Sequence, residues 1–137
     1  MQAEELRDFA ARYTAAWCSQ DAKRVAACYS PSGSLSVNGG APAVGRTAIA
    51  EVAQSFMSAF PDLRVIMDDV LVQGERTEYQ WTLIGTNSGR GGRGQRVRIR
   101  GFELWRMGED GLIASSQGHF DSREYQHQLE HGARPAG

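Results

Sequence analysis

The hydrophobic pattern of the chain changes its period at Pro61. Before Pro61, apolar residues recur three or four positions apart, which predicts a helix over residues 3–18 and another, beginning near Ile49, that Pro61 stops. Between these two helices, the same spacing predicts a short helix that Asp21 caps and that Pro31 and Gly33 end. The first half of the chain is therefore predicted to form three helices.

The second half of the chain predicts a sheet. Four segments are rich in β-branched and aromatic residues and are separated by glycine-containing turns: residues 63–73, 76–86, 96–107 and 112–120. A shorter alternating segment at residues 34–38 adds a strand between the second and third helices. Helices followed by an antiparallel meander predict an α+β fold, with the helices packed on one face of a curved sheet.

Length and charge favour one compact domain without a polyanionic partner. The 137 residues include 15 basic and 16 acidic side chains, for a net charge of -1, so the overall field that attracts nucleic acid is missing. We expect a single domain over residues 1–131 and a flexible tail over residues 132–137. The charged N-terminal segment and the lack of any long apolar run predict a cytoplasmic protein that does not enter membranes.

The two cysteines do not form a recognisable metal or disulfide motif. Cys18 and Cys28 lack C-x-x-C spacing and have no histidine cluster beside them. We therefore expect two buried free thiols, no bound metal and no cofactor.

The most basic segment, residues 87–101, contains five arginines and no acid. Arg96, Arg98 and Arg100 share one parity of a predicted strand whose other parity is mostly apolar. Because strand side chains alternate between faces, the arginines are expected to point outward, toward solvent or a second subunit. RNA or phosphate binding is the alternative, which the balanced charge disfavours. The same alternation places Glu103, on the apolar parity, on the inner face.

Glu103 is the first candidate for a functional residue. Counting from the predicted turns places it among Trp81 and Trp105, where a carboxyl group loses solvation and its pKa rises. Such a group can donate a hydrogen bond or act as an acid at neutral pH. A structural ion pair and a solvated position at the sheet rim are the alternatives. Tyr13, on the inner face of the first helix, is either a second donor to the same cavity or an ordinary core aromatic.

Two other polar residues have structural alternatives. Asn38, at the end of a short strand, either reaches the cavity or serves as a turn residue beside two glycines. Asp121 and Glu124 have the spacing of a capping box ahead of a helix over residues 122–131. We therefore expect Asp121 to cap that helix rather than to act in catalysis.

Several stretches of the chain together resemble one known family: FAARYTAAWCSQDAKRVAACY, VGRTAIAEV, GFELWRMGEDGLIAS and HFDSREYQHQL. The chain resembles the SnoaL-like polyketide cyclase group of the nuclear-transport-factor-2-like superfamily. This resemblance implies a cone-shaped, curved antiparallel sheet with three N-terminal helices that enclose a pocket, and it implies a homodimer. The superfamily includes isomerases, cyclases, dehydratases, epoxide hydrolases and binding modules, so the fold alone does not define the activity.

The catalytic residues of the related enzymes are only partly present. The aspartate of the polyketide cyclases falls at Gly118. The chain is similar to ketosteroid isomerases at Tyr13, whose counterpart donates to the substrate oxyanion, and at Glu103, whose counterpart is a protonated oxyanion-hole acid. Their general base falls at Asn38, which takes no proton, and a further pocket tyrosine falls at Ala53.

We therefore expect an enzyme that stabilises the oxyanion or enolate of a small apolar or polycyclic carbonyl compound, by isomerase, cyclase or lyase chemistry. A binding protein with the same pocket and no turnover is the alternative. Glu103 and Tyr13 are the predicted catalytic residues, with a water held by Asn38 or Ser116, a substrate group or Glu103 itself as proton acceptor. The predicted substrate-binding residues are Trp17, Tyr29, Asn38, Phe56, Trp81, Trp105, Ser116 and Gly118.

Overall fold

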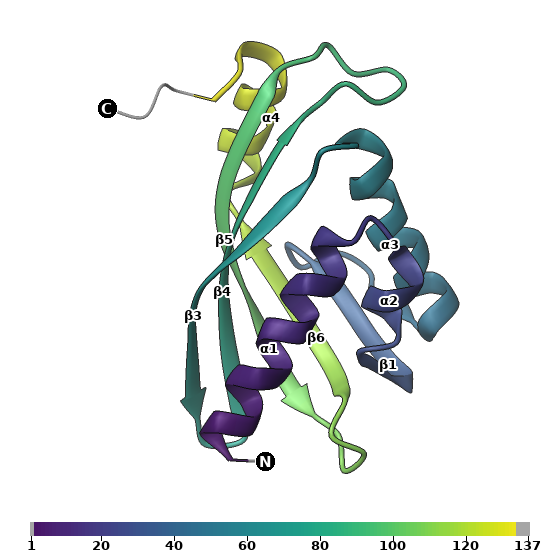
Figure 1. The fold of residues 1–137 in the computed structure, drawn as a ribbon, viewed down its shortest axis with the longest axis vertical. Helices are drawn as coiled ribbons and strands as arrows, with labels where there is room; N and C mark the ends of the chain where they lie inside the picture. Colours follow the sequence, from purple (N-terminus) through teal and green to yellow (C-terminus); the bar gives the residue numbers. More distant parts are fainter. Residues whose placement is uncertain (1, 134–137) are drawn as a thin grey trace.

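The computed structural model describes residues 2–133 and has the predicted α+β fold. Its first half comprises α1 (Ala3–Cys18), α2 (Ala22–Ala26), β1 (Tyr29–Val37), β2 (Ala43–Val44) and α3 (Arg46–Ala59). Its second half comprises β3 (Arg64–Gln73), β4 (Arg76–Thr86), β5 (Arg96–Met107), β6 (Ile113–Phe120) and α4 (Ser122–His131). The long strands lie side by side behind α1, with α4 at the opposite end from the N-terminus (Figure 1).

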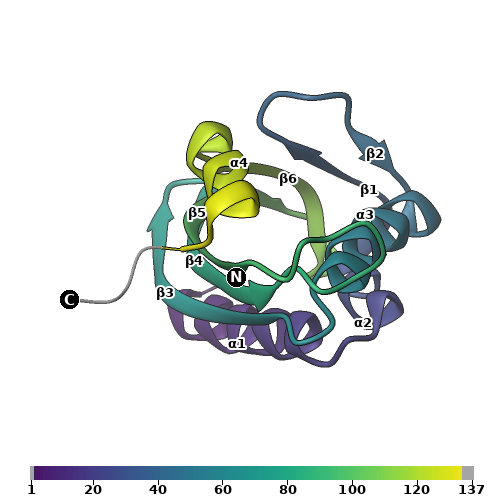
Figure 2. The ribbon, with the colours of Figure 1, turned by 90° about the horizontal axis from the view of Figure 1, so that it is seen from above.

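The six strands form one sheet in the order β2-β1-β6-β5-β4-β3. Neighbouring strands are antiparallel except for β1 and β6, which are parallel. The sheet curves strongly, α1, α2 and α3 close its open side, and α4 lies over one end (Figure 2). The curvature turns one face of the sheet into a concave inner surface.

The alternation along β5 is confirmed. Arg96, Arg98 and Arg100 are exposed, whereas Val97 and Ile99 are buried. Glu103 follows the buried parity and is only 8% exposed. The arginine-rich strand therefore supplies an outer surface, and the inner surface of β5 carries one carboxyl group.

The registers of three strands bring the inner residues together. Tyr79 of β4 pairs with Glu103 of β5, and Trp81 of β4 pairs with Gly101. On the other side of β5, Glu103 pairs with Gly118 of β6. The prediction that Trp81 lies near Glu103 on the inner face is thus confirmed.

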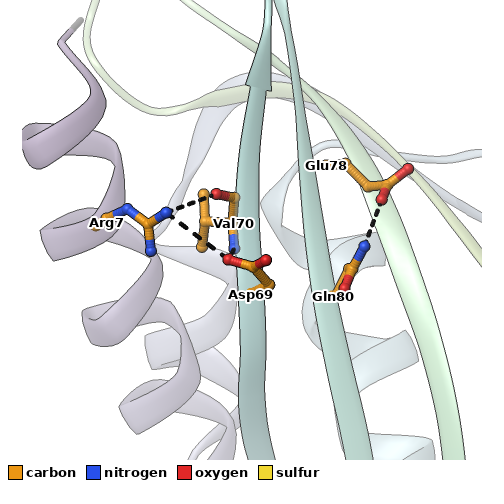
Figure 3. Close-up of polar contacts among 5 residues, drawn as sticks. All are labelled: Arg7, Asp69, Val70, Glu78 and Gln80. Atoms are coloured by element: carbon orange, nitrogen blue, oxygen red, sulfur yellow. Dashed lines mark hydrogen bonds and ion pairs between the residues drawn. The ribbon is translucent and has the colours of Figure 1, made fainter.

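Helix α1 packs its apolar face on the sheet and is tied to β3. The Arg7 guanidinium donates to the Val70 carbonyl at 3.2 Å and lies 3.7 Å from the Asp69 carboxylate (Figure 3). Since both charged side chains are about half exposed, the ion pair itself adds little stability. A second contact in Figure 3, from Gln80 to Glu78 at 2.7 Å, links neighbours on one face of β4.

The loop between β4 and β5 packs against the end of α3 (Figure 2). The Gly89 amide donates to the Ala59 carbonyl, and a Cβ atom at Gly89 would lie 2.0 Å from the Ser58 carbonyl oxygen. Glycine is required here because the backbones approach so closely. Arg90 and Arg93 remain exposed at the loop surface.

The prediction for the second helix and first strand was wrong in its boundaries. Helix α2 ends at Ala26, and Pro31 and Gly33 lie inside β1 instead of ending the helix. The pairing of β1 with β6 shifts register between Tyr29 and Ser34. An irregular segment of this kind tolerates a residue without an N–H group, which explains how a strand contains a proline.

Three further predictions concerned the two cysteines, membrane-spanning helices and the C-terminal tail. Cys18 is exposed and Cys28 partly exposed, so the prediction of buried thiols was wrong. None of the described helices is long and apolar enough to cross a membrane. Of the predicted tail, Gly132 and Ala133 are hydrogen-bonded to Gln128 and Arg96, and residues 134–137 lie outside the described residues.

Candidate functional site

A pocket lies on the concave face of the sheet, between α1, α3 and α4. Its cavity volume is about 60 Å³, which is the volume of about two water molecules in the liquid. Glu103 is the only charged group among the described residues that line it. The remaining lining is mostly apolar and includes six aromatic residues: Trp17, Phe56, Tyr79, Trp81, Phe120 and Tyr125.

The two carboxyl oxygens of Glu103 have different surroundings. Oε1 accepts hydrogen bonds from the Ser116 hydroxyl at 2.6 Å, the Tyr13 hydroxyl at 2.9 Å and the Trp105 indole at 3.0 Å. The only hydrogen bond to Oε2 among the described residues is a longer one of 3.3 Å from Tyr13. Oε1 is thus saturated with donors, and Oε2 is the oxygen with capacity left for a molecule in the pocket.

Burial controls the ionisation of this carboxyl group. Loss of solvation raises the pKa of Glu103 above its ordinary value of 4.5, against the opposing effect of the donors Ser116, Trp105 and Tyr13. The neutral form is therefore favoured to a higher pH than for a glutamic acid in water.

Tyr13 lies behind Glu103 rather than on the pocket surface. Its side chain is fully buried and its hydroxyl lies 2.9 Å from the hydroxyl of Tyr29. When Tyr13 donates to Glu103, Tyr29 must donate to Tyr13, because each hydroxyl has one proton. Burial raises the pKa of both tyrosines, so both hydroxyls stay protonated. The predicted catalytic role of Tyr13 remains a prediction, and this geometry favours one that acts through Glu103.

The predicted site residues fall into three groups. Those that line the pocket are Trp17, Phe56, Trp81, Glu103 and Gly118. Those that form the hydrogen-bonded cluster behind it are Tyr13, Tyr29, Trp105 and Ser116. Asn38 belongs to neither group: it has a positive φ of 50°, and its side chain accepts from the Phe120 amide at 2.9 Å. Asn38 is therefore a turn residue, which was the alternative prediction for this position.

Helix α4 supplies a pocket residue that the sequence analysis did not identify. Asp121 caps the helix by accepting from the amides of Arg123 and Glu124, as expected. Tyr125, one turn later, lines the pocket and packs edge-on against Phe120 with ring centroids 5.3 Å apart. The spacing of Tyr125 and Leu129, both packed against the core, is the sequence signal that marks this face of the helix.

A buried glutamine joins α4 to the sheet. The pairing of β5 with β6 ends where Gly101 meets Phe120. Beyond this point, the Gln128 side chain accepts from the Arg98 amide at 2.7 Å. Gln128 is 5% exposed, so α4 covers the edge of β5 and the end of the pocket together.

No group of three His, Cys, Asp or Glu side chains within residues 2–133 lies close enough to hold a metal ion. In particular, Glu103 is surrounded by hydroxyl, indole and aromatic groups. Among the described residues that line the pocket, Glu103 is the only carboxylic acid and is therefore the side chain best suited to donate or accept a proton.

Comparison with known proteins agrees with this fold. A hypothetical protein with a ketosteroid isomerase-like fold from Catenulispora acidiphila DSM 44928, solved in complex with trimethylamine, shares 15% identity over 95% of both chains, with a TM-score of 0.78. A protein from Jannaschia Sp. CCS1, described as a SnoaL-like polyketide cyclase, shares 16% identity over 96% of this chain and 94% of its own, with a TM-score of 0.80.

A third similar structure is SalBIII, an epoxide hydrolase/cyclase-like enzyme in pyran ring formation of the polyether salinomycin. It shares 17% identity over 90% of this chain and 97% of its own, with a TM-score of 0.77. Comparison with curated protein sequences gives no match. At these identities the solved structures show the fold alone. The SnoaL-like domain profile, however, matches residues 10–116, most of the 137-residue chain, and the chain therefore belongs to the SnoaL-like domain family.

Proposed function

We propose that this protein is a cofactor-independent enzyme that acts on a small, mostly apolar carbonyl compound, with Glu103 as the group that contacts the reacting oxygen. The observation that supports this proposal is the asymmetry of the carboxyl group. Three donors occupy Oε1, and Oε2 is left for the ligand in a pocket that is otherwise apolar.

The neutral form of Glu103 has a defined orientation. Since Oε1 accepts three hydrogen bonds, the proton of the neutral acid belongs on Oε2, from which it can be donated to a substrate carbonyl. A donor fixed in this way stabilises the negative charge that develops on the oxygen when an adjacent C–H or C–C bond breaks. Isomerases, cyclases and lyases of carbonyl compounds share an enolate of this kind.

Tyr13 and Ser116 then act as positioning residues. Their hydroxyls hold Oε1 and thereby aim Oε2 without touching the substrate. Glu103 is also the only carboxyl group among the described lining residues. While neutral Glu103 donates to the carbonyl oxygen, the proton of a breaking C–H bond therefore passes to a water molecule or to a group of the substrate itself.

The first experiment measures enolisation directly. Cyclohexanone, a small one-ring ketone, is incubated with the protein in D₂O, and loss of its α-proton signals is followed by NMR. Glu103→Gln keeps a carbonyl oxygen for the three donors and an N–H group in place of Oε2, so it should slow exchange less than the apolar Glu103→Leu. Removal of one oxyanion donor typically costs about 10²- to 10³-fold. Equal exchange by wild type and a folded Glu103→Leu variant would overturn the proposal.

A binding protein for a small alkylammonium ion is the second candidate. Six aromatic rings and one carboxyl group around a small cavity are features of sites that bind such cations, and one structural neighbour was solved with trimethylamine. The two candidates differ in pH dependence, because a cation favours ionised Glu103 and a carbonyl favours the neutral acid. Tetramethylammonium, which does not titrate, should bind more tightly as pH rises if this candidate is correct, whereas cyclohexanone should bind more weakly.

A further inference from the structure

The pocket around Glu103 is smaller than the ligands proposed for it. Its cavity volume is about 60 Å³, whereas sites that enclose a small organic molecule typically have about 300–1,000 Å³. At least one wall of the pocket must therefore move outward before a one-ring compound reaches Glu103.

The sheet and two of the helices are poorly suited to such a movement. The strands that form the floor of the pocket are hydrogen-bonded to one another along their lengths. Helix α3 buries Ile49, Ala53 and Met57. Helix α1 buries six residues: Leu6, Phe9, Ala10, Tyr13, Ala16 and Trp17. Displacing either helix would expose much of the apolar core to water, which is costly.

Helix α4 is anchored by far fewer buried residues. Gln128 is its only buried residue, and it is a polar one. The two apolar residues of α4 that pack against the core, Tyr125 and Leu129, are half-buried. Segments with few buried apolar contacts open most readily in native proteins. Among the walls of the pocket, α4 is therefore the one whose displacement costs least.

The attachment of α4 to the rest of the fold allows a hinge. A single residue, Asp121, separates the end of β6 from the start of α4. The hydrogen bonds of α4 and Ala133 to the sheet lie at and just before the start of β5: Gln128 with Arg98, Ala133 with Arg96, and Glu130 with Gln95. Helix α4 lies over one end of the curved sheet (Figure 2), where Tyr125 lines the pocket. Rotation about Asp121 would break these hydrogen bonds and carry Tyr125 outward.

We propose that α4 is the movable wall of the pocket: it undocks from β5 about Asp121, and only the undocked form has room for a one-ring ligand beside Glu103. This inference rests on the proposed function, in which a compound of that size binds at Glu103. Because the ligand binds only the undocked form, ligand binding and undocking favour each other. The Arg98 amide, whose acceptor is the Gln128 side chain, loses its hydrogen bond on undocking and therefore reports it.

The test is native-state hydrogen exchange followed by NMR. In the wild type, the Arg98 amide and the amides of α4 should exchange through one common opening, with protection factors at least about tenfold lower than those of α1. Saturating cyclohexanone should accelerate exchange at Arg98 further, because it increases the population of the undocked form. The indole N–H signal of Trp105, which is bonded to Glu103, shows when the ketone has saturated the pocket.

Leu129→Ala loosens α4 without changing the pocket lining. Leu129 and Leu112 are both partly buried leucines that pack against the core, and neither lines the pocket. Leu129→Ala should increase the undocked population about five- to thirtyfold and tighten cyclohexanone binding by the same factor. The control Leu112→Ala, at the turn before β6, should change neither quantity. Equal effects of the two substitutions would contradict the role of α4.

The outcomes separate this inference from the proposed function. If Arg98 exchanges no faster than α1, or if cyclohexanone saturates the Trp105 signal without accelerating exchange at Arg98, the α4 inference is wrong and the role of Glu103 stands. If tetramethylammonium accelerates exchange at Arg98 and cyclohexanone does not bind, α4 is the movable wall and the proposed enzymatic function is wrong. If neither probe gives a saturable shift in the wild type or in Leu129→Ala, both proposals are overturned.

Discussion

Glu103→Gln separates the effect of charge from the effect of hydrogen bonding at the buried acid. The amide oxygen of glutamine can accept from Tyr13, Trp105 and Ser116 as Oε1 does, and the side chain keeps nearly the same shape. The substitution therefore removes the ionisation of residue 103 and leaves the cluster behind it intact. Any change in the free energy of unfolding that depends on pH is then a consequence of that ionisation.

The sign of the effect follows from the raised pKa. Burial lifts the pKa of Glu103 in the folded state above its ordinary value of 4.5. Below that ordinary value the carboxyl group is neutral in both states, and wild type and Glu103→Gln should differ by less than about 1 kcal/mol. As pH rises above it, the unfolded state releases the proton first, so wild type loses stability relative to the variant until the folded pKa is passed. Each unit of pKa difference is worth about 1.4 kcal/mol.

Urea unfolding followed by tryptophan fluorescence measures this difference at several values between about pH 4 and about pH 9. The control is Glu78→Gln, which makes the same chemical change at a partly exposed position on β4 that is bonded to Gln80. Glu103→Gln should become more stable relative to wild type as pH rises, and this gain should exceed that of the control. Parallel curves for wild type and Glu103→Gln would refute the argument that burial governs this carboxyl group.

Two other changes test the surroundings of the site, and a third tests the proposed homodimer. Tyr13→Phe removes a donor to Glu103 and should lower stability by about 1–3 kcal/mol; it should also move the pH midpoint of the Glu103 effect upward, which a purely structural loss would not do. Gln128→Leu leaves the Arg98 amide without its acceptor, so hydrogen exchange at Arg98 should accelerate while exchange in α1 is unchanged. Leu104→Asp should convert a homodimer, which we propose forms through the outer sheet face, into monomers by light scattering; a wild type that is itself monomeric would contradict that proposal.

The sequence predicted the regular elements well where a single periodicity governs a segment. The helix at residues 3–18 and the strands at residues 76–86 and 96–107 have the predicted boundaries. The first strand was predicted too short because Pro31 and Gly33 are read as helix terminators from local chemistry alone. Their tolerance depends on the register shift against β6, a contact with a segment about eighty residues away that no local pattern reveals.

The candidate site was predictable to the extent that strand parity determines it. Alternation along β5 placed Glu103 and Trp105 on the same inner face, which the hydrogen bond between them confirms. The division of the neighbours of Glu103 between pocket and interior was not predictable, because it depends on sheet curvature. Tyr125 was missed for a related reason: α4 follows the last strand and returns over the pocket, and the direction of that return is a tertiary feature.

Position 118, opposite Glu103, is a glycine, so Glu103 is the only carboxyl group among the described residues that line the pocket. A Cβ atom at Gly118 would lie 3.4 Å from the Ser36 carbonyl and 3.7 Å from Cγ of Glu103, which are ordinary contacts, and its φ is not positive. Neither backbone conformation nor a severe clash therefore requires glycine there. A second carboxyl group at this position would disfavour ionisation of both acids and would occupy space beside the Glu103 side chain. With glycine, that space remains available to a ligand, and one acid with one open oxygen carries the proposed chemistry.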